Sequence, residues 1–154
     1  MQFQNKITPF LAFEDAAEAA AKFYVSILPD SRILKTVPRP ETDAAMTVEF
    51  EIAGLTVVAL NTGHSWEFNE TFSLAVACET QAEIDTLWDA LLEGGEPLAC
   101  GWLKDKFGVR WQIVPAKIGA MLGDPDPVRA KRVYDAMLQM IKLDIATLEA
   151  AYAG

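Results

Sequence analysis

The strongest structural signal in the chain is the segment Cys100-Gly101-Trp102-Leu103-Lys104-Asp105-Lys106-Phe107-Gly108-Val109-Arg110-Trp111-Gln112-Ile113-Val114-Pro115. Large and charged residues alternate in its first part, and a β-branched and aromatic run fills its second part. Phe107-Gly108 supplies a turn between them, because glycine tolerates a positive φ. The stretch therefore predicts a β-hairpin, with Lys104 and Asp105 at its exposed end.

Side chains on the second strand of this hairpin alternate between two faces, with Val109, Trp111 and Ile113 on one and Arg110, Gln112 and Val114 on the other. Gln112 brings an amide onto a strand that has the composition of a buried one. An unpaired buried amide costs about 1–3 kcal/mol. Gln112 therefore either closes an internal hydrogen-bond network or faces a ligand cavity.

Composition limits the class of protein. The chain has 154 residues, 51% of them hydrophobic, which suits one domain with a substantial core. Its net charge of −9 disfavours nucleic acid as a partner. Residues 1–10 lack a signal-peptide pattern, and no apolar run reaches the roughly 18 residues that a membrane span needs. We expect no membrane partner and a soluble, cytoplasmic protein, in which Cys78 and Cys100 are small buried residues rather than catalytic ones.

The first half predicts the element order βαβββ. An apolar strand covers residues 6–13, and a helix follows over 15–28, where Asp15 and Glu18 have the spacing of a capping box. Strands follow over 31–37, 46–52 and 55–60, and the polar segment 61–70 is a loop.

The second half repeats this order. A strand over 72–78 leads to a helix over 80–93, again with a capping pair, Thr80 and Glu83, and the hairpin closes the module. Placing Asp15 on Thr80 also places Thr8 on Ser73, Phe23 on Trp88 and Ile27 on Leu92, and placing Gly54 on Gly108 sets Val58 opposite Gln112. The coincidence indicates an internal repeat. We expect one domain, 1–154, made of module 6–60, module 72–115 and an extension over 116–154.

A tandem βαβββ repeat with these residues resembles the vicinal oxygen chelate superfamily, also called the glyoxalase/bleomycin resistance/dioxygenase fold, and within it the PhnB-like branch. The residues that carry the resemblance are Ile7-Thr8-Pro9-Phe10-Leu11, Phe23-Tyr24, Phe68-Asn69, Cys100-Gly101-Trp102-Leu103-Lys104-Asp105, Phe107-Gly108 and Trp111-Gln112-Ile113-Val114-Pro115. The resemblance implies an α+β protein with a curved mixed sheet. Members of the branch often carry the label demethylubiquinone methyltransferase, but the chain lacks a Gly-rich strand-to-helix turn with an acidic residue about 20 positions later, so we expect no nucleotide-type methyl-donor site.

The resemblance also implies where a metal ion would bind. Metal-dependent relatives hold a divalent ion with two inward-facing His, Glu or Gln side chains from each module, and the matching positions here are Thr8, Val58, Ser73 and Gln112. Thr, Val, Ser and Gln supply neither an anion nor an imidazole, and Gln112 alone resembles a ligand. We therefore expect no metal and no other cofactor, with a divalent ion as the less favoured alternative.

The remaining site candidates are polar and aromatic. Thr8, Ser73 and Gln112 are expected to line a cavity as hydrogen-bonding groups, with Trp66, Phe68 and Trp102 as an aromatic lining. His64 is the candidate acid or base, since its ordinary pKa lies near neutrality, although a loop histidine is also typical of a solvated surface.

After Pro115, the pair Asp126-Pro127 predicts the start of a helix. The pattern of residues 128–151 predicts that this is one long helix with an apolar stripe. The resemblance suggests a homodimer. Two functions stay open: a protein that binds a small molecule in the cupped sheet without a metal, as bleomycin-resistance relatives do, or an enzyme (lyase, isomerase or oxygenase type) that acts on a small oxygen-rich substrate, with or without a metal.

Overall fold

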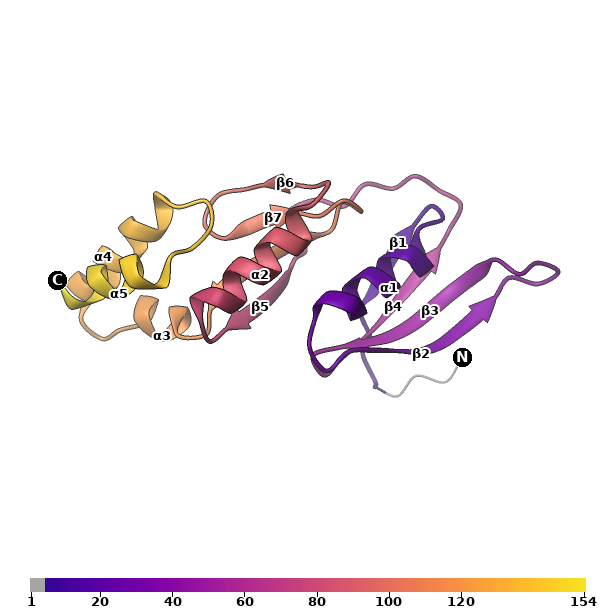
Figure 1. Ribbon diagram of the computed structural model, residues 1–154, viewed down its shortest axis with the longest axis horizontal. Coiled ribbons are helices and arrows are strands. Elements are labelled where there is room, and N and C mark those ends of the chain that lie inside the picture. The colour runs from indigo at the N-terminus through magenta and orange to yellow at the C-terminus, as the bar shows by residue number, and fades with distance from the viewer. Residues whose placement is uncertain (1–4) are drawn as a thin grey trace. The chain divides into compact units, whose positions relative to one another are not determined.

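The computed structural model describes residues 5–154, so residues 1–4 of the expected domain lie outside the described part of the chain. The chain divides into two compact units, Met1–Glu67 and Phe68–Gly154 (Figure 1). The first unit contains the first predicted module, and the second contains the second module and the C-terminal helices. That the two units make one domain stays a prediction.

The first unit is a four-stranded mixed sheet with one helix. Its elements are β1 (Phe10–Phe13), α1 (Ala17–Ile27), β2 (Arg32–Pro38), β3 (Ala45–Ile52) and β4 (Leu55–Asn61). The strands lie in the order β1-β4-β3-β2, and β1 runs parallel to β4. The helix packs on β3 and β4, where the Tyr24 ring lies 6.2 Å from the ring of Phe50 between centroids.

The second unit repeats this plan. Its module consists of β5 (Leu74–Cys78), α2 (Gln81–Leu92), β6 (Glu96–Pro97), β7 (Trp102–Lys104) and β8 (Arg110–Pro115). The strand order β5-β8-β7-β6 is equivalent to that of the first sheet. The apolar side of α2 covers one face of the sheet, because Ile84 and Leu91 are buried there together with Trp111 and Ile113.

The strand register confirms the repeat that the sequence indicates. Phe10 pairs with Val58 in the first sheet, and Ala75 pairs with Gln112 in the second. These pairs are equivalent in the alignment that places Thr8 on Ser73 and Gly54 on Gly108. The predicted α+β class with tandem βαβββ modules is therefore confirmed.

The two module helices begin differently. Thr80 caps α2 as predicted, since its hydroxyl accepts a hydrogen bond from the N–H of Glu83 at 3.2 Å. The capping box predicted at Asp15 is wrong: α1 begins after Ala16, without a side-chain cap from that residue. Instead Asn61, at the end of β4, accepts from the N–H of Ala17 at 2.9 Å. The parallel pairing of β1 with β4 brings this distant amide to the helix.

The predicted hairpin is β7 and β8, and Gly108 has the expected positive φ of 89° in its turn. The predicted surface position of Asp105 is wrong, because its side chain is 1% exposed. Its carboxylate accepts from the N–H groups of Phe107 at 2.8 Å and Val109 at 3.0 Å, so the turn folds around it. Lys104 is partly exposed and pairs with Glu96.

The C-terminal extension forms three short helices, α3 (Ile118–Leu122), α4 (Pro127–Leu138) and α5 (Ile145–Ala153). Asp126 caps α4 as predicted, but the single long helix over 128–151 is wrong. Asp144 starts a new helix by accepting from the N–H of Thr147 at 2.7 Å. The carbonyls of Met140 and Ile141 accept from the N–H groups of Cys100 and Gly101, directly before β7, instead of continuing α4. Among residues 5–154, no helix combines the length and the apolar character needed to cross a bilayer.

Candidate functional site

The second sheet has one face that α2 does not cover, and we call it the open face. Burial alternates along β8, with Trp111 and Ile113 buried and Arg110, Gln112 and Val114 partly exposed on the opposite side. Gln112 has Ala75 on one neighbouring strand and Trp102 on the other as its cross-strand partners. Side chains of register partners share a face, so Gln112 and Trp102 both belong to the open face.

Gln112 finds its partner on this face. Its Nε2 donates a hydrogen bond to the hydroxyl of Ser73 at 2.9 Å, in a partly buried contact. Ser73 directly precedes β5, which lies beside β8. In the repeat alignment Ser73 matches Thr8 and Gln112 matches Val58. The Gln112–Ser73 pair forms the internal hydrogen bond that was one of the two expected outcomes for Gln112.

Arg110 organises the end of the open face next to the turn. Its Nε and Nη2 donate to one oxygen of Glu70 at 3.0 and 2.9 Å, and its Nη1 donates to the carbonyls of Phe68 at 3.2 Å and Gly108 at 2.7 Å. The hydrogen bond from Arg110 lowers the pKa of the Glu70 carboxyl below its usual value. Phe68, predicted as an aromatic lining residue, is thus fixed through its backbone.

A shallow groove of about 340 Å³ lies beside Trp102. Its lining residues are Glu70, Leu98, Ala99, Cys100 and Trp102. Leu98, Ala99 and Trp102 give it an apolar lining, and Glu70, held by Arg110, gives it a polar end. Sequence reasoning found Trp102 but missed Arg110 and Glu70, which are 40 residues apart and whose contact has no local signal.

Three of the predicted site residues lie in the first unit. Thr8 is partly exposed just before β1. His64 and Trp66 are exposed in the loop after β4, where their rings stack at 5.6 Å between centroids. Ser73, Phe68, Trp102 and Gln112 lie in the second unit. The expected convergence of the two groups on one cavity stays a prediction.

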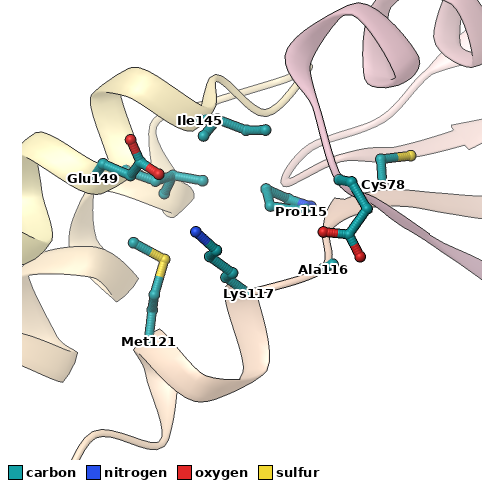
Figure 2. Close-up of a pocket in the computed structure, with 9 residues that line it drawn as sticks. Cys78, Pro115, Ala116, Lys117, Met121, Ile145 and Glu149 are labelled. Atoms are coloured by element: carbon teal, nitrogen blue, oxygen red, sulfur yellow. The ribbon is translucent and has the colours of Figure 1, made fainter.

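A second hollow lies between α3, α5 and the ends of β5 and β8 (Figure 2). Met121, Ile145 and Leu148 line it, and Figure 2 shows the Lys117 amine directed toward it. Its volume of about 30 Å³ holds roughly one or two water molecules, which is too small for an organic ligand. Cys78 at its edge is buried, which raises the pKa of its thiol to about 11 and makes it a poor nucleophile.

The chemistry of the donors does not suit a divalent metal. At the four positions that match the ligands of metal-dependent relatives, Gln112 and Ser73 bond to each other, and Thr8 and Val58 supply neither an anion nor an imidazole. Within residues 5–154, no group of three or more His, Cys, Asp and Glu side chains lies close enough together to hold an ion.

Comparison with known proteins gives a family match over residues 5–114, to a model described as 3-demethylubiquinone-9 3-methyltransferase. No curated protein matches the chain. Among solved structures, the PhnB protein of Bacillus cereus is 33% identical, with a TM-score of 0.68 over 73% of this chain and 100% of that one.

Two more distant structures share the fold alone. A protein of Pseudomonas aeruginosa is 22% identical, with a TM-score of 0.61 over 71% of this chain and 96% of that one. The fosfomycin resistance protein FosX of Listeria monocytogenes, solved with Mn(II) and sulfate, is 15% identical, with a TM-score of 0.53 over 73% of this chain and 92% of that one.

Proposed function

This chain belongs to the 3-demethylubiquinone-9 3-methyltransferase family of PhnB-like proteins, in the vicinal oxygen chelate superfamily, and on that premise we propose that it binds a small amphipathic molecule without a metal ion. The binding surface in this proposal is the open face of the second sheet with the groove beside Trp102. Methyl transfer is not part of the proposal, because the segment that joins β1 to α1, Glu14-Asp15-Ala16, lacks the glycines of a nucleotide-type methyl-donor turn.

The observation that carries the proposal is the chemistry of the open face. Gln112 and Ser73 form a neutral hydrogen-bonded pair where metal-dependent relatives place ligands, and Trp102 presents an indole beside them. Neutral donors and acceptors beside an aromatic surface suit a ligand with an apolar body and one hydrogen-bonding group. The groove volume of about 340 Å³ is of the size that small-molecule pockets have.

The polar end of the groove narrows the class of ligand. Arg110 already donates two hydrogen bonds to Glu70, and the side chain of Arg110 is only 13% exposed. Both hydrogen bonds reach the same oxygen of Glu70, and the side chain of Glu70 is 57% exposed, so the groove ends in an accessible carboxylate rather than in a free cation. We infer that the ligand carries a hydrogen-bond donor and no anionic group where it meets this end. A homodimer, which the family resemblance suggests, is part of the same proposal.

Two measurements test the proposal. The protein, purified without an affinity tag, is analysed for bound metals by mass spectrometry, and the uncharged fluorescent probe N-phenyl-1-naphthylamine is titrated into it. We expect no stoichiometric divalent ion and saturable binding of the probe. A stoichiometric ion, together with absence of probe binding, would overturn the proposal and favour the metal-dependent enzyme.

Two variants test whether the probe binds at the groove. Trp102→Ala removes the indole beside the groove and should weaken probe binding about tenfold. Tyr134→Ala is the matched control, since Tyr134 is a 49% exposed aromatic residue on α4 that is not among the groove-lining residues. It should leave the affinity within about twofold. Equal losses in the two variants would show that the probe does not report on the groove.

A further inference from the structure

We propose that residues 139–143 of the C-terminal extension, which we call the brace, position the edge of the groove. The brace fixes Cys100 and Gly101, and these two residues set the place of Trp102. Its effect on binding rests on the proposed function, whereas its effect on Trp102 does not.

Two backbone hydrogen bonds tie the brace to the two residues that directly precede β7. The N–H of Cys100 donates to the carbonyl of Met140 at 2.9 Å, and the N–H of Gly101 donates to the carbonyl of Ile141 at 2.7 Å. Both donors have left-handed backbone conformations, with φ of 60° and 82°. A non-glycine residue such as Cys100 adopts this region only when its surroundings hold it there. The brace supplies such a restraint directly before Trp102.

The contact at Gly101 is too close for any other residue. A Cβ at this position would lie 2.9 Å from the carbonyl oxygen of Ile113 and 2.9 Å from Cγ of Leu143. Leu143 is fully buried, so it cannot move aside without opening the small core of the extension. The carbonyl of Gly101 also accepts from the N–H of Ile113 at 2.8 Å. The brace, the residue before β7 and the middle of β8 are therefore packed against one another.

A second anchor holds the other side of the brace on α2. Gln81 donates from Nε2 to the carbonyl of Leu143 at 3.1 Å, and its Oε1 accepts from the N–H of Ile145 at 2.8 Å. Lys142 pairs with Asp85 at 2.9 Å on the same helix. With one anchor on α2 and the other on the residues directly before β7, the brace restrains the distance between α2 and the edge that carries Trp102.

The brace lies outside the part of the chain that the family shares. The family match ends at residue 114, and the whole Bacillus cereus protein aligns with 73% of this chain. The segment that carries Trp102 lies within the matched part. The groove beside Trp102 therefore lies in the part of the chain that matches the family, whereas the brace that borders it does not. The brace thus gives this chain a means of adjusting ligand selectivity.

Gln81→Ala tests the inference, because it removes both hydrogen bonds from Gln81 to the extension, together with its hydrogen bond to Asp85 at 3.0 Å, without touching the groove. Thr86→Ala is the matched control: Thr86 lies on the same helix, and its hydroxyl donates only to the carbonyl of Ala82. We expect the amides of Cys100 and Gly101 to exchange with solvent about tenfold faster in Gln81→Ala, relative to amides in the middle of α2, and to change less than about twofold in the control.

Fluorine NMR of protein labelled with fluorotryptophan gives the second readout. The chain has 4 tryptophans, and Trp→Phe variants assign their signals. We expect Gln81→Ala to shift the Trp102 signal and to leave that of Trp66 in place. Unchanged exchange at Cys100 and Gly101 with an unchanged Trp102 signal would overturn the inference. If Gln81 only stabilised the unit as a whole, Gln81→Ala would instead speed the exchange of all amides of the second unit alike.

Affinity for N-phenyl-1-naphthylamine separates this inference from the proposed function. If the probe binds the unmodified protein beside Trp102, we expect Gln81→Ala to weaken it about threefold, which is a smaller loss than removing the indole itself gives. A shifted Trp102 signal with unchanged probe affinity would support the positioning of Trp102 but overturn the effect of the brace on binding. Absence of probe binding to the unmodified protein would contradict the proposed function, while the exchange and fluorine measurements would still decide the role of the brace.

Discussion

The carboxylate of Asp105 accepts a hydrogen bond from the indole nitrogen of Trp111 at 2.9 Å, inside the hairpin of the second sheet. Its other oxygen accepts from the N–H groups of Phe107 and Val109. One buried side chain thus joins the turn to the largest buried side chain of β8. Because Trp111 faces α2, the Asp105 contact also helps to orient the opposite, open face that carries Gln112.

Asp105→Ala should therefore be severely destabilising. It leaves two backbone donors and an indole N–H without their acceptor in a buried place, and each such loss costs about 1–3 kcal/mol. We expect a loss of about 3–5 kcal/mol in the free energy of unfolding, measured by urea denaturation.

Further variants show which contact of Asp105 accounts for that loss. Trp111→Phe removes the indole donor alone, and the double variant with Asp105→Ala gives the coupling energy between the two side chains. Lys104→Ala, next to Asp105 but partly exposed, should change stability by no more than about 0.5 kcal/mol. An Asp105→Ala protein as stable as Lys104→Ala would show that the turn does not depend on the carboxylate.

The repeat was predictable because its signals are local and occur twice. Thr80 and Glu83 mark a helix start within four residues, and Gly108 marks a turn by its own conformational freedom. Hydrophobic alternation along β8 also identified the face of Gln112 correctly. Signals of this kind depend on neighbours in sequence, so a single sequence contains them completely.

What the sequence did not reveal depends on distant partners. Asn61 caps α1 from 44 positions away, and Arg110 reaches Glu70 across 40 positions. The break between α4 and α5 had a local signal, since Asp144 is a good N-cap residue, but the diversion of the Ile141 carbonyl to Gly101 had none. Long-range hydrogen bonds between side chains and backbone become visible only when the fold has placed both partners.

Trp88→Ala should test the core of the second module. Trp88 is 4% exposed on the inner side of α2, and replacing a large buried side chain with alanine costs about 3–5 kcal/mol through lost contacts and a cavity. Urea denaturation gives the free energy of unfolding, with the partly exposed Lys104→Ala as the comparison. Equal costs for the two variants would contradict the placement of α2 on the sheet.

Acid should loosen the start of α5. The hydrogen bond from Thr147 lowers the pKa of the Asp144 carboxyl below its ordinary value of 3.8. A carboxyl with a lowered pKa in the folded state contributes stability above its unfolded pKa, and that stability is lost as the pH falls through the folded value. We therefore expect helicity of the extension, measured by circular dichroism, to fall below about pH 4.

Asp144→Asn separates the cap from its charge. Asparagine is an equally good N-cap, so the variant should retain the stability of the extension at neutral pH and lose part of its acid sensitivity. Asp144→Ala removes the cap and should cost about 1 kcal/mol at neutral pH. If helicity is lost over the same pH range in Asp144→Asn, the pH dependence arises from other carboxyls. Asp85 is an example, since the hydrogen bond from Lys142 lowers its pKa.

Gln112 provides the sharpest test of metal-free binding. Gln112→Leu keeps much of the volume but removes the amide that donates to Ser73, so it should cost about 1 kcal/mol of stability and weaken binding of the fluorescent probe. Gln112→Glu adds one carboxylate, but the matching positions Thr8, Val58 and Ser73 still offer no anion or imidazole. Calorimetric titration with zinc, manganese and nickel should therefore find no tight binding to either the unmodified protein or Gln112→Glu. Submicromolar binding of one ion per chain to the unmodified protein, abolished in Gln112→Leu, would contradict a metal-free site, because the amide would then be a ligand rather than a partner of Ser73.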